Sequence, residues 1–160
     1  MQDTGMVRRI DELGRVVIPK EIRKTLRIKE GDPLEIYTDK EELVLRKYSP
    51  IASLGDFSSS VAEGVEKITE KSCIITDTDK VVFVTGKDKG LEGKTLSDKM
   101  NAIMKERKSV LIASGEGAEP VCVTESDNGA ENQIIVPIVS GGDCYGTVVV
   151  FDNDKTKRFN

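Results

Sequence analysis

The opening 47 residues hold several short elements that together are too small to bury a core. Two short apolar runs, at 6–10 and 15–18, predict strands on either side of a turn at 11–14. Pro19 removes a ladder donor and so ends the second strand, and it also suits the first position of a helix. A helix is therefore expected over 20–27. Its basic residues Lys20, Arg23, Lys24 and Arg27 share one face, and Ile22 and Leu26 form an inward-facing i, i+4 pair.

A hairpin is expected to complete this segment, with strands at 34–37 and 43–47. Four short strands and a two-turn helix bury too little apolar surface to offset the conformational entropy lost on folding. The segment contains no cysteine that could add a disulfide. Its size therefore predicts an obligate oligomer, in which a second copy supplies the missing surface.

Tyr48–Pro50 marks a boundary, because Pro50 cannot continue a ladder. Beyond it an inward-facing helical stripe is expected over 54–68, followed by a helix over 96–108. Expected strands are 73–76, 81–84, 121–123, 133–139 and 145–151, and 110–112 fits either a strand or a helix end. This order predicts an antiparallel sheet with helices packed on it, and hence an α+β chain.

Positive charge is concentrated near the amino terminus although the net charge is −4. Residues 1–48 carry 11 Lys and Arg against 10 Asp and Glu, whereas 49–160 carry 13 against 18. Within 7–29 there are eight basic residues and three acidic ones. Arginine binds phosphates and guanine edges through its planar fork, so this concentration indicates a nucleic-acid-binding module.

The composition argues against an enzyme, since the chain has no histidine and no catalytic spacing of other residues. No metal site and no cofactor are expected. Cys73, Cys122 and Cys144 lie far apart in or beside apolar runs, as reduced, small buried side chains would. No apolar run approaches the roughly 20 residues of a membrane span, and no signal peptide is evident. We therefore expect a cytoplasmic, nucleoid-associated protein without a membrane partner.

The run from Thr4 to Arg23, with its core Gly14-Arg-Val-Val-Ile-Pro19, closely resembles the AbrB-type swapped-hairpin DNA-binding family. The match continues through Leu26, Glu30-Gly-Asp32 and the two hairpin strands. The resemblance implies that residues 1–48 form an AbrB/MazE-like β-barrel from two interlocked chains. It also implies a homodimeric, sequence-specific regulator of transcription that binds double-stranded DNA.

Carried over residue by residue, the resemblance implies a set of DNA contacts on the segment before Pro19 and on the helix after it. We expect Arg15 and Arg23 to reach base edges, and Arg8, Arg9 and Lys20 to hold the phosphate backbone. Lys24 stands where some relatives have arginine and so retains only a phosphate contact. The expected DNA-binding residues are Arg8, Arg9, Arg15, Lys20, Arg23 and Lys24.

Residues 51–160 follow in the position that a GAF-like domain occupies in the sporulation regulators of this family. The implied roles are sensing of a small-molecule effector or oligomerisation, up to a tetramer, in a regulator of sporulation or developmental genes. The domain is expected to lack the final helix typical of such modules. The loops Gly86–Gly90 and Gly115–Gly117 either rim a ligand pocket or are plain surface loops.

Another class of protein uses the same amino-terminal barrel. An antitoxin carries a disordered tail that wraps a toxin, whereas the strand-rich pattern of 51–160 favours an ordered domain. Binding of a toxin would favour the antitoxin interpretation, and turnover of a nucleotide would favour a small enzyme.

Overall fold

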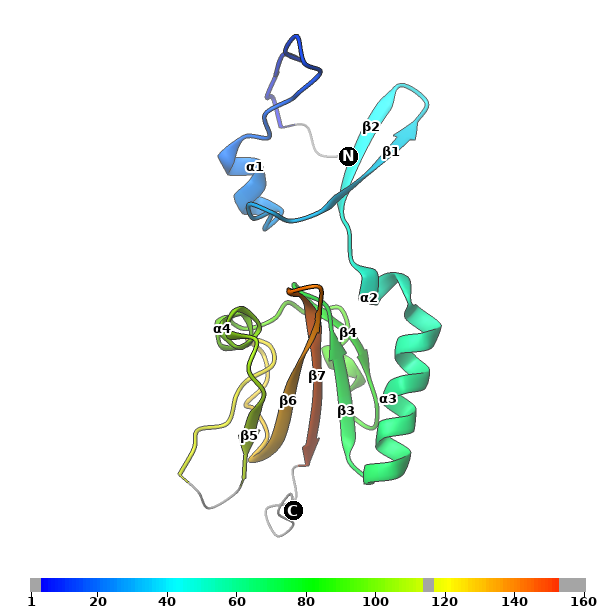
Figure 1. Ribbon diagram of the computed structural model, residues 1–160, viewed down its shortest axis with the longest axis vertical. Coiled ribbons are helices and arrows are strands. Elements are labelled where there is room, and N and C mark those ends of the chain that lie inside the picture. The colour runs from blue at the N-terminus through cyan, green and yellow to red at the C-terminus, as the bar shows by residue number, and fades with distance from the viewer. Residues whose placement is uncertain (1–3, 114–116, 153–160) are drawn as a thin grey trace. The chain divides into compact units, whose positions relative to one another are not determined.

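The computed structural model describes residues 4–113 and 117–152, and the chain divides into two units between Tyr48 and Ser49 (Figure 1). The first unit contains a short helix and a two-stranded hairpin. The second contains a five-stranded antiparallel sheet with helices packed on it. The chain is therefore an α+β protein.

The hairpin of the first unit is regular and confirms the sequence prediction. Strand β1 (Leu34–Asp39) pairs antiparallel with β2 (Glu42–Lys47) through six consecutive residue pairs. The two-residue turn between them places Lys40 in the left-handed region, at φ 52°. Both strands are mostly exposed, so the hairpin presents its apolar side chains without covering them.

Helix α1 (Lys20–Thr25) follows Pro19, whose φ of −58° suits the start of a helix. The predicted helix is confirmed, but it ends two residues early. Arg27 adopts a positive φ of 52°, its N–H bonds the Lys24 carbonyl, and the Ile28 N–H bonds the Arg23 carbonyl. This pair of bonds is a Schellman motif, which satisfies the last helical carbonyls and stops the helix. The predicted inward pair is only partly correct, because Ile22 is half-buried whereas Leu26 is 53% exposed.

The predicted strands at 6–10 and 15–18 are wrong for the single chain. Both segments are irregular, although the turn between them forms as expected, with the Gly14 N–H donating to the Asp11 carbonyl at 3.0 Å. Strands exist only where a neighbour accepts and donates their backbone hydrogen bonds. Within one chain, no such neighbour lies beside these two segments among the residues the structure describes.

The sheet of the second unit has the strand order β4-β3-β7-β6-β5, and every neighbouring pair is antiparallel. The long central hairpin joins β6 to β7, with a register shift between Ile138 and Val139. Its strands are β3 (Ser72–Thr76), β4 (Val81–Val84), β5 (Val110–Ile112), β6 (Asn132–Ser140) and β7 (Asp143–Asp152).

Alternation along β3 and β7 divides the apolar side chains between two faces. On one face, helix α2 (Pro50–Ser53) and helix α3 (Gly55–Thr69) cover a small cluster around Ala62, Cys73 and Ile75 (Figure 1). The larger cluster lies on the other face and includes Met100 and Met104 of helix α4 (Asp98–Glu106). The short 3-10 helix η1 (Lys89–Leu91) packs there through Leu91.

Helix α3 forms as predicted but turns a different face to the sheet. Its buried residues are Ser58 and Ala62, whereas Phe57 is 65% exposed and Ile68 is 85% exposed. The predicted inward stripe was therefore wrong at Leu54, Phe57 and Ile68. Val61 and Val65 of the predicted stripe do pack against the cluster on the sheet, and the Ser58 hydroxyl donates to the Ile51 carbonyl of α2 at 3.1 Å.

Two shorter predictions also have clear outcomes. Residues 110–112 form strand β5, which settles that ambiguity. The strand predicted at 121–123 is wrong, because only an isolated bridge between Leu96 and Thr124 forms there. The side-chain amide of Gln133 donates to the Val121 carbonyl and accepts the Val121 N–H. Both backbone groups of Val121 are therefore already bonded and cannot join a strand ladder.

Candidate nucleic-acid interface

The turn at 11–14 fixes the position of Arg15. Asp11 Oδ1 accepts the backbone N–H groups of Leu13 and Arg15, at 3.0 and 2.8 Å. Asp11 Oδ2 accepts the Nε–H of Arg15 at 2.8 Å. These hydrogen bonds from Arg15, first backbone and then side chain, lower the pKa of the Asp11 carboxyl below its ordinary value. The Asp11 carboxylate is therefore charged at neutral pH, and it fixes the position of Arg15, one of the predicted DNA contacts.

Arg15 remains available to a ligand despite this pairing. Its side chain is 72% exposed, and the bond to Asp11 uses only Nε. The guanidinium fork has two further nitrogens, whose N–H groups can donate to two acceptors at once. Such a fork matches the paired acceptors of a guanine edge or a phosphate.

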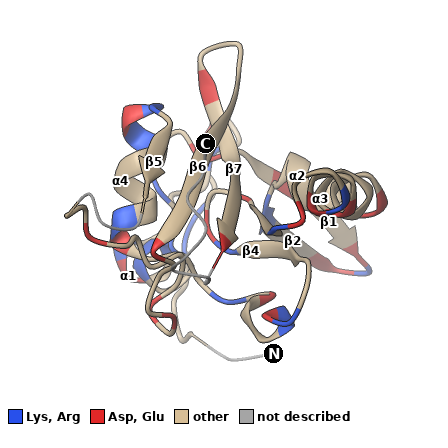
Figure 2. Cartoon of the chain, turned by 90° about the horizontal axis from the view of Figure 1, so that it is seen from below, with Lys and Arg blue, Asp and Glu red and all other residues tan. Residues whose placement is uncertain are grey.

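The predicted contact residues of α1 are all exposed. Figure 2 shows basic segments along this helix, which carries Lys20, Arg23 and Lys24. None of the three forms a salt bridge within residues 4–113 and 117–152. An exposed basic cluster without acidic partners presents its full charge to a polyanion.

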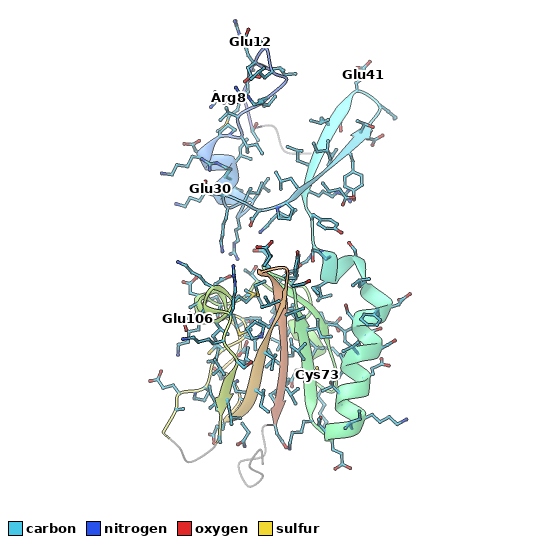
Figure 3. The ribbon with its side chains drawn as sticks, in the orientation of Figure 1. Arg8, Glu12, Glu30, Glu41, Cys73 and Glu106 are labelled. Atoms are coloured by element: carbon cyan, nitrogen blue, oxygen red, sulfur yellow. The ribbon has the colours of Figure 1, made fainter. Side chains whose placement is uncertain are left out.

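Arg8, which Figure 3 labels, lies on the segment that leads into the turn, and Arg9 follows it in the chain. Both are exposed, and the backbone N–H of Asp11 donates to the Arg15 carbonyl at 3.0 Å, which joins this segment to the one after the turn. The six predicted contacts thus fall into two groups in one unit. One group is Arg8, Arg9 and Arg15 around the turn, and the other is Lys20, Arg23 and Lys24 on α1.

The first unit also exposes an unusual amount of apolar surface. Pro19 is the one buried residue between 4 and 48. Large apolar side chains that a folded domain would cover lie open, with Val7 at 86% and Val17 at 74% exposure. The others are Met6, Ile10, Leu13, Val16, Leu26, Ile36, Tyr37, Leu43, Leu45 and Tyr48.

Sequence reasoning treated Asp11 as a turn residue and missed its bond to Arg15. The signal was present, because Asp favours turns by accepting backbone N–H groups two to four residues ahead. A carboxylate held in that way, four residues before an arginine, is well placed to accept its side chain as well.

Other chemistry finds little support in the described residues. No group of three or more potential metal ligands occurs among them. None of the helices described is long and apolar enough to cross a membrane. The expectation of a small buried side chain is confirmed for Cys73, where burial, with a smaller effect from Glu66, raises the pKa of the thiol to about 11. Cys122 and Cys144 are half-buried.

Family models match both parts of the chain. Residues 53–160 match the family described as "Stage V sporulation protein T C-terminal, transcription factor". Residues 7–53 match the family described as "Antidote-toxin recognition MazE, bacterial antitoxin".

Two relatives from Bacillus subtilis (strain 168) are similar in sequence. Stage V sporulation protein T is 44% identical over 158 residues, which cover 98% of this chain and 88% of the relative. Transition state regulatory protein AbrB is 62% identical over 50 residues, which cover 31% of this chain and 52% of the relative.

One solved structure resembles the fold over much of the chain. It is a methyl-accepting chemotaxis protein, residues 122 to 287, with a TM-score of 0.52 and 18% identity, covering 69% of this chain and 83% of that one. The likeness shows that an antiparallel sheet with packed helices of this kind also occurs in a solved structure.

Proposed function

The chain belongs to the stage V sporulation protein T family of transcription factors, and we propose that two interlocked copies of its first unit bind operator DNA through six basic residues each. The observation that carries this proposal is the state of residues 4–48 in the single chain. Most of their basic side chains are exposed, and so are most of their large apolar ones.

A second copy would supply what the single chain lacks. The segments 6–10 and 15–18 have the composition of strands but pair with no other strand in the part of the chain that the structure describes. Interlocking two chains in a swapped-hairpin barrel gives each segment a partner and covers Val7 and Val17. Burial of such side chains contributes roughly 1.5–3 kcal/mol each, which offsets part of the entropy lost when the short segments become ordered. Folding of this unit and dimerisation are therefore one process.

Doubling the unit also doubles its charge. Each copy brings Arg8, Arg9, Arg15, Lys20, Arg23 and Lys24, so the dimer presents two such sets related by a two-fold axis. Binding a duplex would release condensed counterions, which makes affinity fall steeply with salt. Arg15 and Arg23 read base edges in this arrangement, while Arg8, Arg9, Lys20 and Lys24 hold phosphates.

The second unit acts as the regulatory part, a GAF-like domain for effector sensing or further oligomerisation up to a tetramer. Its sheet has helices on both faces, and its larger apolar cluster lies beside a cavity. An antitoxin role is less well supported, because residues 49–152 form an ordered sheet rather than a tail that could wrap a partner. The regulator acts on sporulation genes at the nucleoid.

Genome-wide mapping of bound sites tests the proposal. The wild-type protein is expected to occupy a discrete set of promoters in sporulating cells. An Arg15→Ala, Arg23→Ala double variant should lose those sites while its cellular level and sedimentation stay unchanged. Arg46→Gln removes a cationic side chain of the same unit outside the six and should keep them. Equal occupancy by the wild type and the double variant would contradict the assignment.

A further inference from the structure

A cavity of about 470 Å³ opens on the α4 face of the sheet in the second unit. Three of its apolar residues come from the sheet, namely Ile74 of β3 and Val149 and Phe151 of β7. Leu91 of η1, Val123 and Ala130 complete the apolar lining. Its volume lies within the range of small-molecule pockets, and its lining is typical of them.

The wall of the cavity between 120 and 131 is fixed by side chains that bond its backbone. Asp127 accepts the N–H groups of Val123, Thr124 and Gly129. The Gly129 φ of +69° and its close approach to Pro120, where a Cβ would lie 2.8 Å from the Pro120 Cβ, fold this segment tightly on itself. The wall is therefore built before any ligand arrives, which lowers the entropic cost of binding.

The polar groups at the cavity determine which ligand it suits. The Asp127 carboxylate already accepts backbone N–H groups of the wall. The side chains of Asp88 and Asn128, by contrast, form no hydrogen bond with the described residues. No lysine or arginine is among the described residues that line the cavity. Lys87 and Lys89 flank Asp88 in the chain and are exposed, and the Lys94 ammonium donates to the Ser126 hydroxyl at 3.0 Å. The lining thus combines apolar side chains with polar ones, among which Asp88 is an uncommitted carboxylate.

We propose that this cavity binds a small molecule with an apolar body and a cationic amino group, and that Asp88 recognises the amine. The inference rests on the proposed sensing role of the second unit and names its ligand class. An apolar body fills the cavity against its apolar lining, of which Leu91 is the most exposed member, while the ammonium pairs with the half-buried carboxylate of Asp88. Carboxylate and phosphate ligands are disfavoured, because Asp88 repels them and no cation in the lining compensates.

Asp88 belongs to the loop Gly86–Gly90, one of the two loops that the sequence offered as a pocket rim. The structure places this loop at the cavity. Most of the other, Gly115–Gly117, lies outside the described residues.

Calorimetric titration of the full chain with three matched probes tests the inference. Phenethylamine, phenylacetamide and phenylacetate share an apolar body but carry a positive, a neutral and a negative head. We expect phenethylamine to bind at least about tenfold more tightly than phenylacetate, which corresponds to about 1.4 kcal/mol. Asp88→Asn should reduce that ratio to within about threefold. Asp143→Asn, which neutralises an exposed carboxylate at the start of β7, should leave it unchanged.

Methyl NMR of the wild-type chain locates the probe without relying on a variant. Phenethylamine should shift the methyl signals of Ile74, Val149 and Ala130 more than that of Ala62 on the opposite face. Shifts confined to other residues, equal affinity for amine and carboxylate, an unchanged ratio in Asp88→Asn, or no binding up to about 10 mM would each overturn the inference. DNA affinity measured on the same preparation separates the outcomes, since a chain that binds DNA but no amine retains the proposed function.

Discussion

Asp11 and Arg15 form a closed pair in which one carboxylate binds both the backbone N–H and the side-chain Nε–H of the same arginine, each at 2.8 Å. The pair fixes the guanidinium relative to its own backbone, while 72% of the arginine side chain stays exposed. An arginine oriented before it meets DNA loses less conformational entropy on binding. We therefore regard Asp11 as a positioning residue for Arg15.

Removal of this carboxylate should weaken DNA binding through Arg15 alone. Asp11→Ala is expected to reduce operator affinity about three- to tenfold, measured by fluorescence anisotropy, with the dimer retained. In an Arg15→Ala background the same change should cost nothing further, because the residue it positions is absent. Glu12→Ala removes the neighbouring carboxylate and should leave affinity unchanged or slightly improved. Equal losses in both backgrounds would show that Asp11 acts on the fold instead.

The Asp11–Arg15 pair also predicts a titration. Arg15 lowers the pKa of the Asp11 carboxyl in the folded chain, so the pair is intact above the unfolded value of about 3.9 and is lost as pH falls through the lower folded value. NMR of the side-chain carboxyl should give a midpoint below that of a peptide spanning residues 8–17. A midpoint equal to that of the peptide would mean that the pair does not persist in solution.

The arginines assigned to base edges should matter more than the lysines assigned to phosphates. Arg15→Ala and Arg23→Ala are each expected to cost at least about tenfold in operator affinity and to reduce the preference for operator over unrelated duplex. Lys20→Ala should weaken both complexes by similar factors and reduce the magnitude of the salt slope by about two, because the dimer loses one phosphate contact from each copy. Sedimentation velocity should show unchanged dimers in all three variants. An arginine variant with normal affinity at near-physiological salt would remove that residue from the contact set.

The exposed apolar side chains of the first unit should be necessary for assembly. Val17→Asp places a charge where the proposed dimer buries an apolar side chain, so it should shift the chain toward monomers and abolish DNA binding. Leu111→Asp makes the same type of change at an exposed position of β5 and serves as the control. Light scattering after size exclusion reports both masses. Dimers formed by Val17→Asp as stably as by the wild type would contradict the interlocked arrangement.

Gly146 is expected to be irreplaceable in the central sheet. A Cβ at this residue would collide with the backbone carbonyl of Thr76, and backbone atoms cannot move aside cheaply. Gly146→Ala should therefore destabilise the second unit by about 2 kcal/mol or more, seen as a lower thermal midpoint. Gly64→Ala, in α3 with open space around it, should raise the midpoint or leave it unchanged, because alanine favours helices by about 1 kcal/mol. Equal thermal midpoints for the two variants would contradict the close approach of Gly146 to the Thr76 backbone.

Much of the fold could be predicted from local sequence patterns. The two strands of the hairpin at 34–47 and the turn between them form where the sequence pattern predicts them, and α1 begins directly after Pro19. The strands and helices of the second unit were found where apolar runs were long enough to be distinctive. The six basic residues were identified through the family resemblance, and the structure shows each of them exposed.

The remaining features depend on contacts that no local pattern records. Residues 6–10 and 15–18 have strand composition, yet a strand also needs a partner, which the single chain does not offer. The face of α3 was mispredicted because periodicity marks an apolar stripe without saying whether it meets the sheet. The bond between Gln133 and the Val121 backbone, which replaces a strand at 121–123, joins residues 12 apart and is invisible to a short window.

The salt dependence of operator binding tests most directly whether two sets of basic residues engage DNA together. The affinity of the full chain for a mapped operator should be measured between about 50 and 300 mM salt and plotted as log K against log salt. One copy offers six candidate contacts, and each neutralised phosphate contributes about −0.9 to the slope of log K against log salt. A single copy therefore gives a slope no steeper than about −5. Two interlocked copies predict a steeper slope, between about −6 and −10. A slope shallower than about −5 would contradict joint binding by both copies.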